Sequence, residues 1–255
     1  MKPTYQDALA AYGIGGAHPG GLALTRKILK KENISRRSKI LDAGCGTGQT
    51  AAFLSKSFRC SVTALDNHPT MIQKAKQRFS DERLPVHAIQ GNVESLPFSD
   101  ASFDFVLSES VTAFTNIADS LKEYCRVLKP GGVLLMIEMT AEKPFQSLEL
   151  KDMKRVYGIS NVFLETEWIQ HLHRSGFTEA AVIFSNTVQS ELQKNTPKKD
   201  NYPEYQISDP MDPQMEELLH EHMKLSRLYQ NILGYRVYRA VRPSLARNKE
   251  KKIKT

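Results

Sequence analysis

The chain has 255 residues, of which 40% are hydrophobic and 25% are charged, and its net charge is +7 at pH 7. These proportions are ordinary for a globular protein with a substantial core, and no run approaches the roughly 18 apolar residues that a membrane span requires. The first residues lack the pattern of a signal peptide, and the three cysteines lack the spacing of a disulfide framework or a metal site. We therefore expect a cytoplasmic protein without membrane association and without a bound metal.

The positive charge is concentrated in the C-terminal tail, where residues 242–255 contain six basic residues against the single acid Glu250. This tail has neither helical nor strand periodicity, and it lacks aromatic residues that could stack on bases. We interpret residues 243–255 as a disordered, solubilising tail and expect no nucleic-acid partner.

Short β-rich runs alternate with helix-length segments along the chain, which predicts a mostly parallel sheet with helices on both faces. The predicted strands are Lys39–Ala43, Ser61–Leu65, Val86–Gln90, Phe103–Ser108, Gly132–Glu138, Phe177–Val188 and Tyr235–Val241. The predicted helices are Gly21–Lys31, Gln49–Ser57, Pro69–Phe79, Asn116–Leu128, Glu165–Ser175 and Gln214–Leu233. The fold class is therefore α/β and doubly wound.

The composition divides the chain into an N-terminal segment at 1–20, a large domain at 21–242 and the tail. Within the domain, a polar and Pro-rich stretch marks an insertion at about 189–233. Ligand crevices in such sheets open at the carboxyl ends of the strands. We expect the N-terminal segment and the insertion to form a mobile lid over this crevice.

A glycine-rich loop, Gly44-Cys45-Gly46-Thr47-Gly48, lies directly between a predicted strand and a predicted helix. Glycines at alternate positions let the backbone turn sharply and approach a ligand, to which the helix presents unpaired N–H groups. The spacing Gly-x-Gly-x-Gly, with Asp42 two residues upstream, differs from the Gly-x-Gly-x-x-Gly of pyrophosphate-binding folds. The loop therefore indicates a ligand in which no pyrophosphate has to be accommodated.

Two later positions suit a nucleoside. The next predicted strand is followed by Asp66, 18 residues after Gly48, and a carboxylate there can accept both hydroxyls of a ribose. Residues 91–98 follow the third predicted strand, where an adenine edge would lie.

Taken in order, five segments resemble the successive motifs of the class I S-adenosylmethionine-dependent methyltransferases: Ile40–Gly48, Asp66, Asn92-Val93, Phe103–Ser108 and Leu128–Gly132. The resemblance covers residues 20–140 closely and reaches more loosely to 167–177 and 234–235. It implies a seven-stranded sheet with an antiparallel last strand and S-adenosyl-L-methionine as cofactor. The family usually has Asp where this chain has Asn92, and Asn retains an acceptor for the adenine amino group.

The resemblance also implies which residues contact the cofactor. The methionine part would lie against Asp42 and the glycine loop, the ribose on Asp66, and the methyl group near the end of the fourth predicted strand. The expected cofactor-binding residues are Asp42, Gly44, Gly46, Gly48, Gln49, Asp66, Asn67, Met71, Asn92, Val93 and Ser108.

The sequence does not identify a catalytic residue, and His18 and Glu109 are the candidates that it offers. The candidates for contact with the substrate are Tyr5, Tyr12, His18, Glu109 and Glu138. His18 also fits a plain loop histidine, Cys45 a packing residue and Trp168 a helix anchor in the core. We interpret the histidines of the later helices as surface residues: His171, His173, His220 and His222.

The expected function is methyl transfer to a small-molecule acceptor. The segment Ser108–Val111 does not match the Asp/Asn-Pro-Pro-aromatic motif of amino-methylating nucleic-acid enzymes, and a Pro-Cys nucleophile is missing. Two alternatives stay open. One is a methyltransferase that acts on a protein or nucleic acid, and the other is a non-catalytic protein that binds S-adenosylmethionine.

Overall fold

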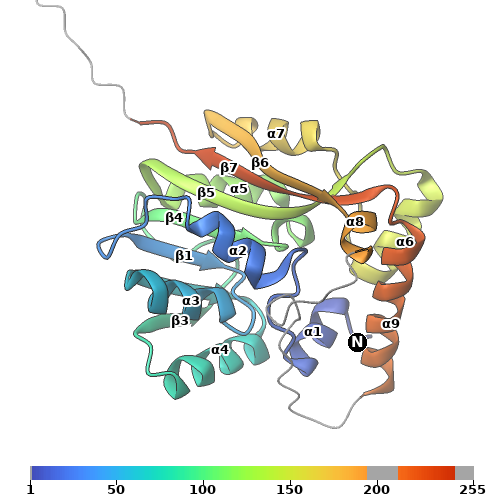
Figure 1. Ribbon diagram of the computed structural model, residues 1–255, viewed down its shortest axis with the longest axis horizontal. Coiled ribbons are helices and arrows are strands. Elements are labelled where there is room, and N and C mark those ends of the chain that lie inside the picture. Colours follow the sequence, from blue (N-terminus) through green and yellow to red (C-terminus); the bar gives the residue numbers. More distant parts are fainter. Residues whose placement is uncertain (1, 194–211, 245–255) are drawn as a thin grey trace, which may run out of the picture.

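The computed structural model describes residues 2–193 and 212–244, which form a seven-stranded sheet in the order β3-β2-β1-β4-β5-β7-β6 (Figure 1). The strands are β1 (Lys39–Ala43), β2 (Ser61–Asp66), β3 (Val86–Gln90), β4 (Phe103–Glu109), β5 (Leu128–Ala141), β6 (Glu179–Thr187) and β7 (Leu233–Val241). Strands β1 to β5 pair in parallel, whereas β7 is antiparallel to both β5 and β6. The predicted fold class, including the antiparallel last strand, is confirmed.

Helices cover both faces of this sheet (Figure 1). They are α1 (Tyr5–Tyr12), α2 (Gly21–Leu29), α3 (Gln49–Phe58), α4 (Pro69–Asp81), α5 (Ile117–Val127), α6 (Ser147–Tyr157), α7 (Glu165–Arg174), α8 (Val188–Leu192) and α9 (Pro213–Leu228), with a 3₁₀ turn η1 at Thr112–Phe114. Side chains alternate along each strand, so that Ile40 packs with α2, α3 and α4 while its neighbour Leu41 packs with α5 and α7. Two separate cores therefore lie on the two faces.

A third core lies at the carboxyl ends of the parallel strands, where α1, α6 and α9 pack together. We name these three helices the helical cap. Figure 1 shows α1 beside α9, and Tyr5 of α1 is buried with Tyr157 of α6 and Leu225 of α9. The cap thus brings the N-terminal segment against residues that lie more than two hundred positions later in the chain.

Local signals set where several helices begin. Thr4 and Asp7 form a capping box at the start of α1. Pro69 occupies the first turn of α4, where its missing N–H would have no partner, and the side chain of His68 accepts a hydrogen bond from the N–H of Thr70. In the part of the chain that the structure describes, no helix combines the length and apolar character of a membrane span.

The structure differs from the predicted elements mainly in the helical cap. Helices α1, α6 and α8 have no counterpart among the predicted helices. The prediction that a helix continues to residue 233 is wrong, because the chain turns after Leu228 and Leu233 already belongs to β7. Residues 194–211 of the predicted insertion and 245–255 of the predicted tail lie outside the described residues.

Candidate active site

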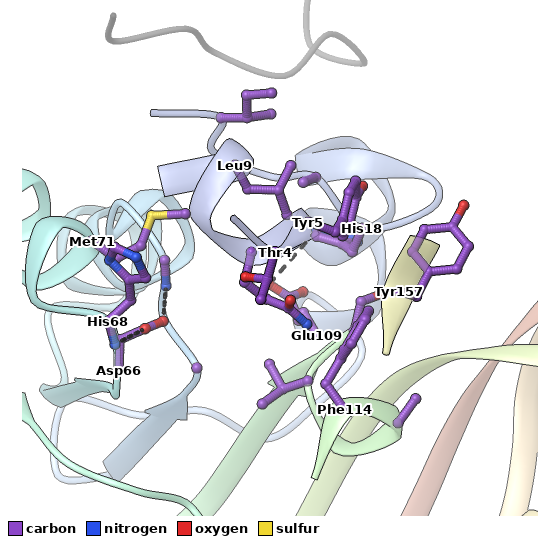
Figure 2. A pocket seen from close by; sticks show the side chains of 18 of the residues that line it. Thr4, Tyr5, Leu9, His18, Asp66, His68, Met71, Glu109, Phe114 and Tyr157 are labelled. Atoms are coloured by element: carbon purple, nitrogen blue, oxygen red, sulfur yellow. Dashed lines mark hydrogen bonds and ion pairs between the residues drawn. The ribbon is translucent and has the colours of Figure 1, made fainter. Parts of the chain in front are cut away.

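A cavity of about 810 Å³ opens at the carboxyl edge of the sheet, between the glycine loop and the helical cap. Figure 2 shows Asp66, His68 and Met71 at one end of it and Phe114 and Tyr157 at the other. The cavity therefore lies where ligands bind in doubly wound sheets.

The glycine loop after β1 forms the floor of the first end. Gly44 has a φ of +82°, and a Cβ at this position would collide with the methyl groups of Val111. Gly46 has a φ of +52°, and a Cβ there would point into open space. Both positions require a backbone conformation that favours glycine, and they leave the main chain itself accessible in the cavity.

Asp66, the last residue of β2, holds the loop and faces the cavity. Its Oδ2 accepts a hydrogen bond from the N–H of Gly46 at 2.8 Å, and its Oδ1 accepts one from the N–H of His68 at 2.9 Å. Each carboxylate oxygen keeps a second acceptor site, so the side chain can also accept the two hydroxyls of a ribose. Burial raises the pKa of Asp66 despite these hydrogen bonds.

Two further carboxyl groups, those of Asp42 and Glu109, lie in the same end of the cavity. Asp42 is 2% exposed, and its Oδ2 lacks a hydrogen-bond partner among the described residues. Burial raises the pKa of Asp42 well above its usual value, and the carboxylates of Glu109 and Asp66 raise it further. The cavity thus concentrates acidic groups at this end, although no group of three His, Cys, Asp or Glu among the described residues is arranged to hold a metal ion.

Glu109 is contacted by side chains from α2, α3 and the loop between α1 and α2. It accepts hydrogen bonds from the hydroxyls of Thr25 at 2.5 Å and Thr50 at 2.7 Å, and its Oε2 lies 3.7 Å from Nε2 of His18. His18 is 7% exposed and also lies 3.2 Å from the Thr25 hydroxyl. The structure therefore brings the two catalytic candidates together, in contact with each other at the cavity wall.

Most of the sequence-predicted site residues line the cavity. Those of the cofactor set that do so are Asp42, Gly44, Gly46, Gln49, Asp66, Asn67, Met71 and Val93, and those of the substrate set are Tyr5, His18, Glu109 and Glu138.

Four predicted residues do not reach the cavity wall, each for a local reason. Ser108 is fully buried on the α5 side of the sheet, where its hydroxyl bonds to Thr112 and Tyr124. Asn92 is exposed, and its Oδ1 accepts a hydrogen bond from the N–H of Glu94. Gly48 lies under Phe79 at the start of α3, and Tyr12 is buried away from the cavity.

The second end of the cavity is lined mainly by aromatic and apolar side chains, beside Lys154 and Arg155 of α6, and the sequence predicts only Tyr5 among the apolar ones. We name it the aromatic end; its residues are Tyr5, Phe114, Met139, Val156, Tyr157 and Ile159. The interpretation of His222 as a surface residue is wrong, because its ring stacks on Tyr5 at 5.1 Å and its Nδ1 lies 2.8 Å from the Tyr157 hydroxyl. The sequence carries no signal for this cluster, since α6 and α9 meet only through the tertiary fold.

The residues of the first end fit the expected cofactor. S-adenosyl-L-methionine carries a positive sulfonium and a positive ammonium group, and the unpartnered oxygen of Asp42 and the neighbouring carboxylates of Asp66 and Glu109 complement these charges. The open space at Gly46 leaves room for a ligand against the main chain.

Comparisons with known proteins agree with this geometry. A family model described as a methyltransferase domain matches residues 41–136. An uncharacterized methyltransferase of Bacillus subtilis, YodH, is 40% identical over 234 residues, which cover 92% of this chain and 97% of that protein. A demethylmenaquinone methyltransferase of Chlorobaculum tepidum is 33% identical over 54% of this chain and 56% of its own length.

A solved structure shows the same fold. It is the Haemonchus contortus phosphoethanolamine N-methyltransferase 2 in complex with S-adenosyl-L-methionine, which is 19% identical with a TM-score of 0.72 over 94% of this chain and 58% of that chain. Together, the glycine loop, the acidic end of the cavity and these relatives show that the chain belongs to the class I S-adenosyl-L-methionine-dependent methyltransferases and is an enzyme of that family.

Proposed function

We propose that this enzyme methylates a small molecule that binds in the aromatic end of the cavity. The observation that carries the proposal is the extent of the cavity, which continues from the cofactor residues to the aromatic end beneath the helical cap. Ligand pockets measure roughly 300–1,000 Å³, so a cavity of about 810 Å³ has room for the cofactor and a small acceptor together.

The names of two relatives support a small acceptor. One is a demethylmenaquinone methyltransferase and the other a phosphoethanolamine N-methyltransferase, and both names specify a small molecule. A protein or nucleic-acid substrate would need an open surface at the reacting group, whereas α1, α6 and α9 all contribute walls to this cavity.

Individual residues of the first end would hold the cofactor. Asp66 would accept the ribose hydroxyls, Asp42 would face the ammonium group, and Met71 with Asn67 would flank the adenine. When bound, the cofactor supplies an electrophilic methyl group, so the protein has to bind the acceptor, orient it and exclude water.

The helical cap is the part of the protein that would exclude water. We infer that α1 and α9 act as the lid that the sequence predicts over the crevice. Thr4, Tyr5 and Asp7 of the N-terminal segment line the cavity together with Leu218 and His222 of α9. A hydrogen bond of 3.2 Å between Nε2 of His68 and Oδ1 of Asp7 ties α1 to the start of α4.

A methylation screen tests the proposed function. The purified enzyme is incubated with methyl-labelled S-adenosyl-L-methionine and fractions of a metabolite library, in parallel with total protein and total RNA. We expect label to enter at least one small-molecule fraction. If label enters only protein or RNA while the enzyme binds S-adenosylhomocysteine normally, the proposed acceptor class is wrong.

A further inference from the structure

Glu138 of β5 is a buried carboxyl group at the cavity wall whose two oxygens differ in their surroundings. Its Oε1 accepts hydrogen bonds from the N–H groups of Thr112 at 2.9 Å and Val111 at 3.3 Å. The Thr112 hydroxyl and the Ala113 N–H also lie near the carboxyl group, but Oε2 has no hydrogen-bond partner in bonding geometry among the described residues, although the side chain is 0% exposed. A buried acceptor without a partner is costly, so a functional partner for Oε2 is the natural explanation.

The position of Glu138 places it between the two ends of the cavity. Its partner Val111 packs with its methyl groups against Gly44 of the cofactor loop. Its other partner, Thr112, begins the η1 turn that ends in Phe114 of the aromatic end. An acceptor in the aromatic end has to present its nucleophile at this junction to meet the methyl group.

We propose that Oε2 of Glu138 binds the nucleophilic group of the acceptor and takes its proton, so that the acceptor is a largely apolar, ring-bearing molecule with a hydroxyl or amine donor. The inference rests on the proposed function and specifies its substrate class. In the transfer, the lone pair of the acceptor forms the bond to the methyl carbon, the carbon–sulfur bond breaks with its electron pair remaining on sulfur, and the O–H or N–H proton passes to Oε2.

The surroundings of Glu138 suit this role. Burial raises its pKa to about 7, near the pH at which a general base works best. The phenols that face it are Tyr124 of α5 and Tyr238 of β7, and burial raises the pKa of both, so they stay neutral. Arg236 lies opposite Glu138 in the strand register, but its guanidinium is bound to Glu142 and Glu165.

Binding of two matched probes tests the assignment without relying on turnover. Naphthol offers a ring with a hydroxyl donor, and fluoronaphthalene has the same ring without a donor. Titrations use the full-length enzyme saturated with S-adenosylhomocysteine. For the wild type we expect naphthol to bind about tenfold more tightly than fluoronaphthalene, as a hydrogen bond to a carboxylate predicts.

The variant Glu138→Gln separates this role from a structural one. Gln retains an oxygen for the N–H of Thr112, so the η1 turn and the affinity for S-adenosylhomocysteine should be unchanged. We expect the variant to lose about tenfold in naphthol affinity, with the fluoronaphthalene affinity unchanged. Glu179→Gln, at an exposed position outside the cavity, is the matched control and should change neither affinity.

Three results would overturn the inference: equal binding of the two probes, binding of neither probe to the wild type, or a loss of naphthol affinity below about threefold in Glu138→Gln.

A further readout uses the small-molecule acceptor found by the methylation screen. Its kcat/KM should rise as the pH increases through about 7 in the wild type and lose this rise in Glu138→Gln. If the screen labels no small molecule, the proposed function is contradicted. If an acceptor is found but its kcat/KM is the same in the wild type and in Glu138→Gln, only this inference is contradicted.

Discussion

At the scale of single residues, the carboxyl groups of the cavity lower the stability of the folded chain but provide binding groups for ligands. Asp42 and Glu138 are buried and Asp66 is half-buried, and desolvation raises the pKa of each. Such a group does not destabilise the folded chain while it is protonated, but it lowers the free energy of unfolding once it ionises. Positions of this kind are typical of sites that bind charged or hydrogen-bonding ligands.

The destabilisation of the folded chain by Glu138 should depend measurably on pH. Its contribution to stability is fully present below the unfolded pKa near 4.5 and is lost as the pH rises through about 7. Compared with the wild type, Glu138→Gln should therefore gain roughly 2 kcal/mol of unfolding free energy between pH 5 and pH 8.5. Urea denaturation at the two pH values measures this, and a difference that stays constant with pH would show that folding does not shift the pKa of Glu138.

Asp66 should dominate the affinity for the cofactor. Asp66→Ala removes the acceptor for the ribose hydroxyls and also the hydrogen bond that holds the N–H of Gly46. We expect the affinity for S-adenosylhomocysteine to fall by about 1.5–3 kcal/mol, the range for hydrogen bonds to a charged group. Titration calorimetry provides the value, and an unchanged affinity would mean that the ribose lies elsewhere.

At the scale of elements, the helical cap is the part of the fold that we expect to respond to ligands. Helix α1 is held by Tyr5, which packs edge-on against Tyr157 at 5.1 Å and stacks on His222. A short helix held by a few side chains can detach without disturbing the cores on the sheet faces.

Hydrogen exchange should detect this response. With S-adenosylhomocysteine and an acceptor bound, the amides of α1 and α9 should exchange more slowly than in the free enzyme, because the lid spends more time closed. Tyr5→Ala should remove the added protection in α1, whereas Tyr5→Phe should keep it because the ring is retained. Equal protection of both helices in the free and bound enzyme would contradict a lid and indicate a permanently packed cap.

At the scale of the whole molecule, the two ends of the cavity differ in charge, which should make ligand preference depend on pH. The acidic end attracts the positive sulfonium of S-adenosyl-L-methionine more than the neutral thioether of S-adenosylhomocysteine. Because their pKa values are raised, Asp42 and Asp66 become protonated at a higher pH than ordinary aspartates.

We therefore expect the preference for the sulfonium form over the thioether form to fall as the pH decreases, in the direction that loss of negative charge dictates. Competitive equilibrium dialysis of the two ligands measures the ratio directly. Asp42→Asn should flatten the pH dependence, since it removes one titrating group. A ratio that is the same at every pH would exclude these carboxylates as the source of charge selectivity.

The features that the sequence alone predicts are those encoded by neighbouring residues. The order of strands and helices, the glycine loop and Asp66 all follow from periodicity and spacing within short segments. The strand predictions for β1 and β3 match the structure residue for residue, because turn-forming residues and polar breaks bound these runs directly. The cofactor end of the cavity is assembled mostly from such local motifs.

What only the tertiary structure decides is which side chains from distant segments face the same space. Ser108 and Glu109 are adjacent in β4, yet strand alternation turns Ser108 into a core and Glu109 to the cavity wall. Tyr5, Tyr157 and His222 meet because three helices pack over the carboxyl ends of the strands. Such contacts depend on long-range packing that has no periodic signal in the chain, so the aromatic end and the unpartnered oxygen of Glu138 become visible only in the folded structure.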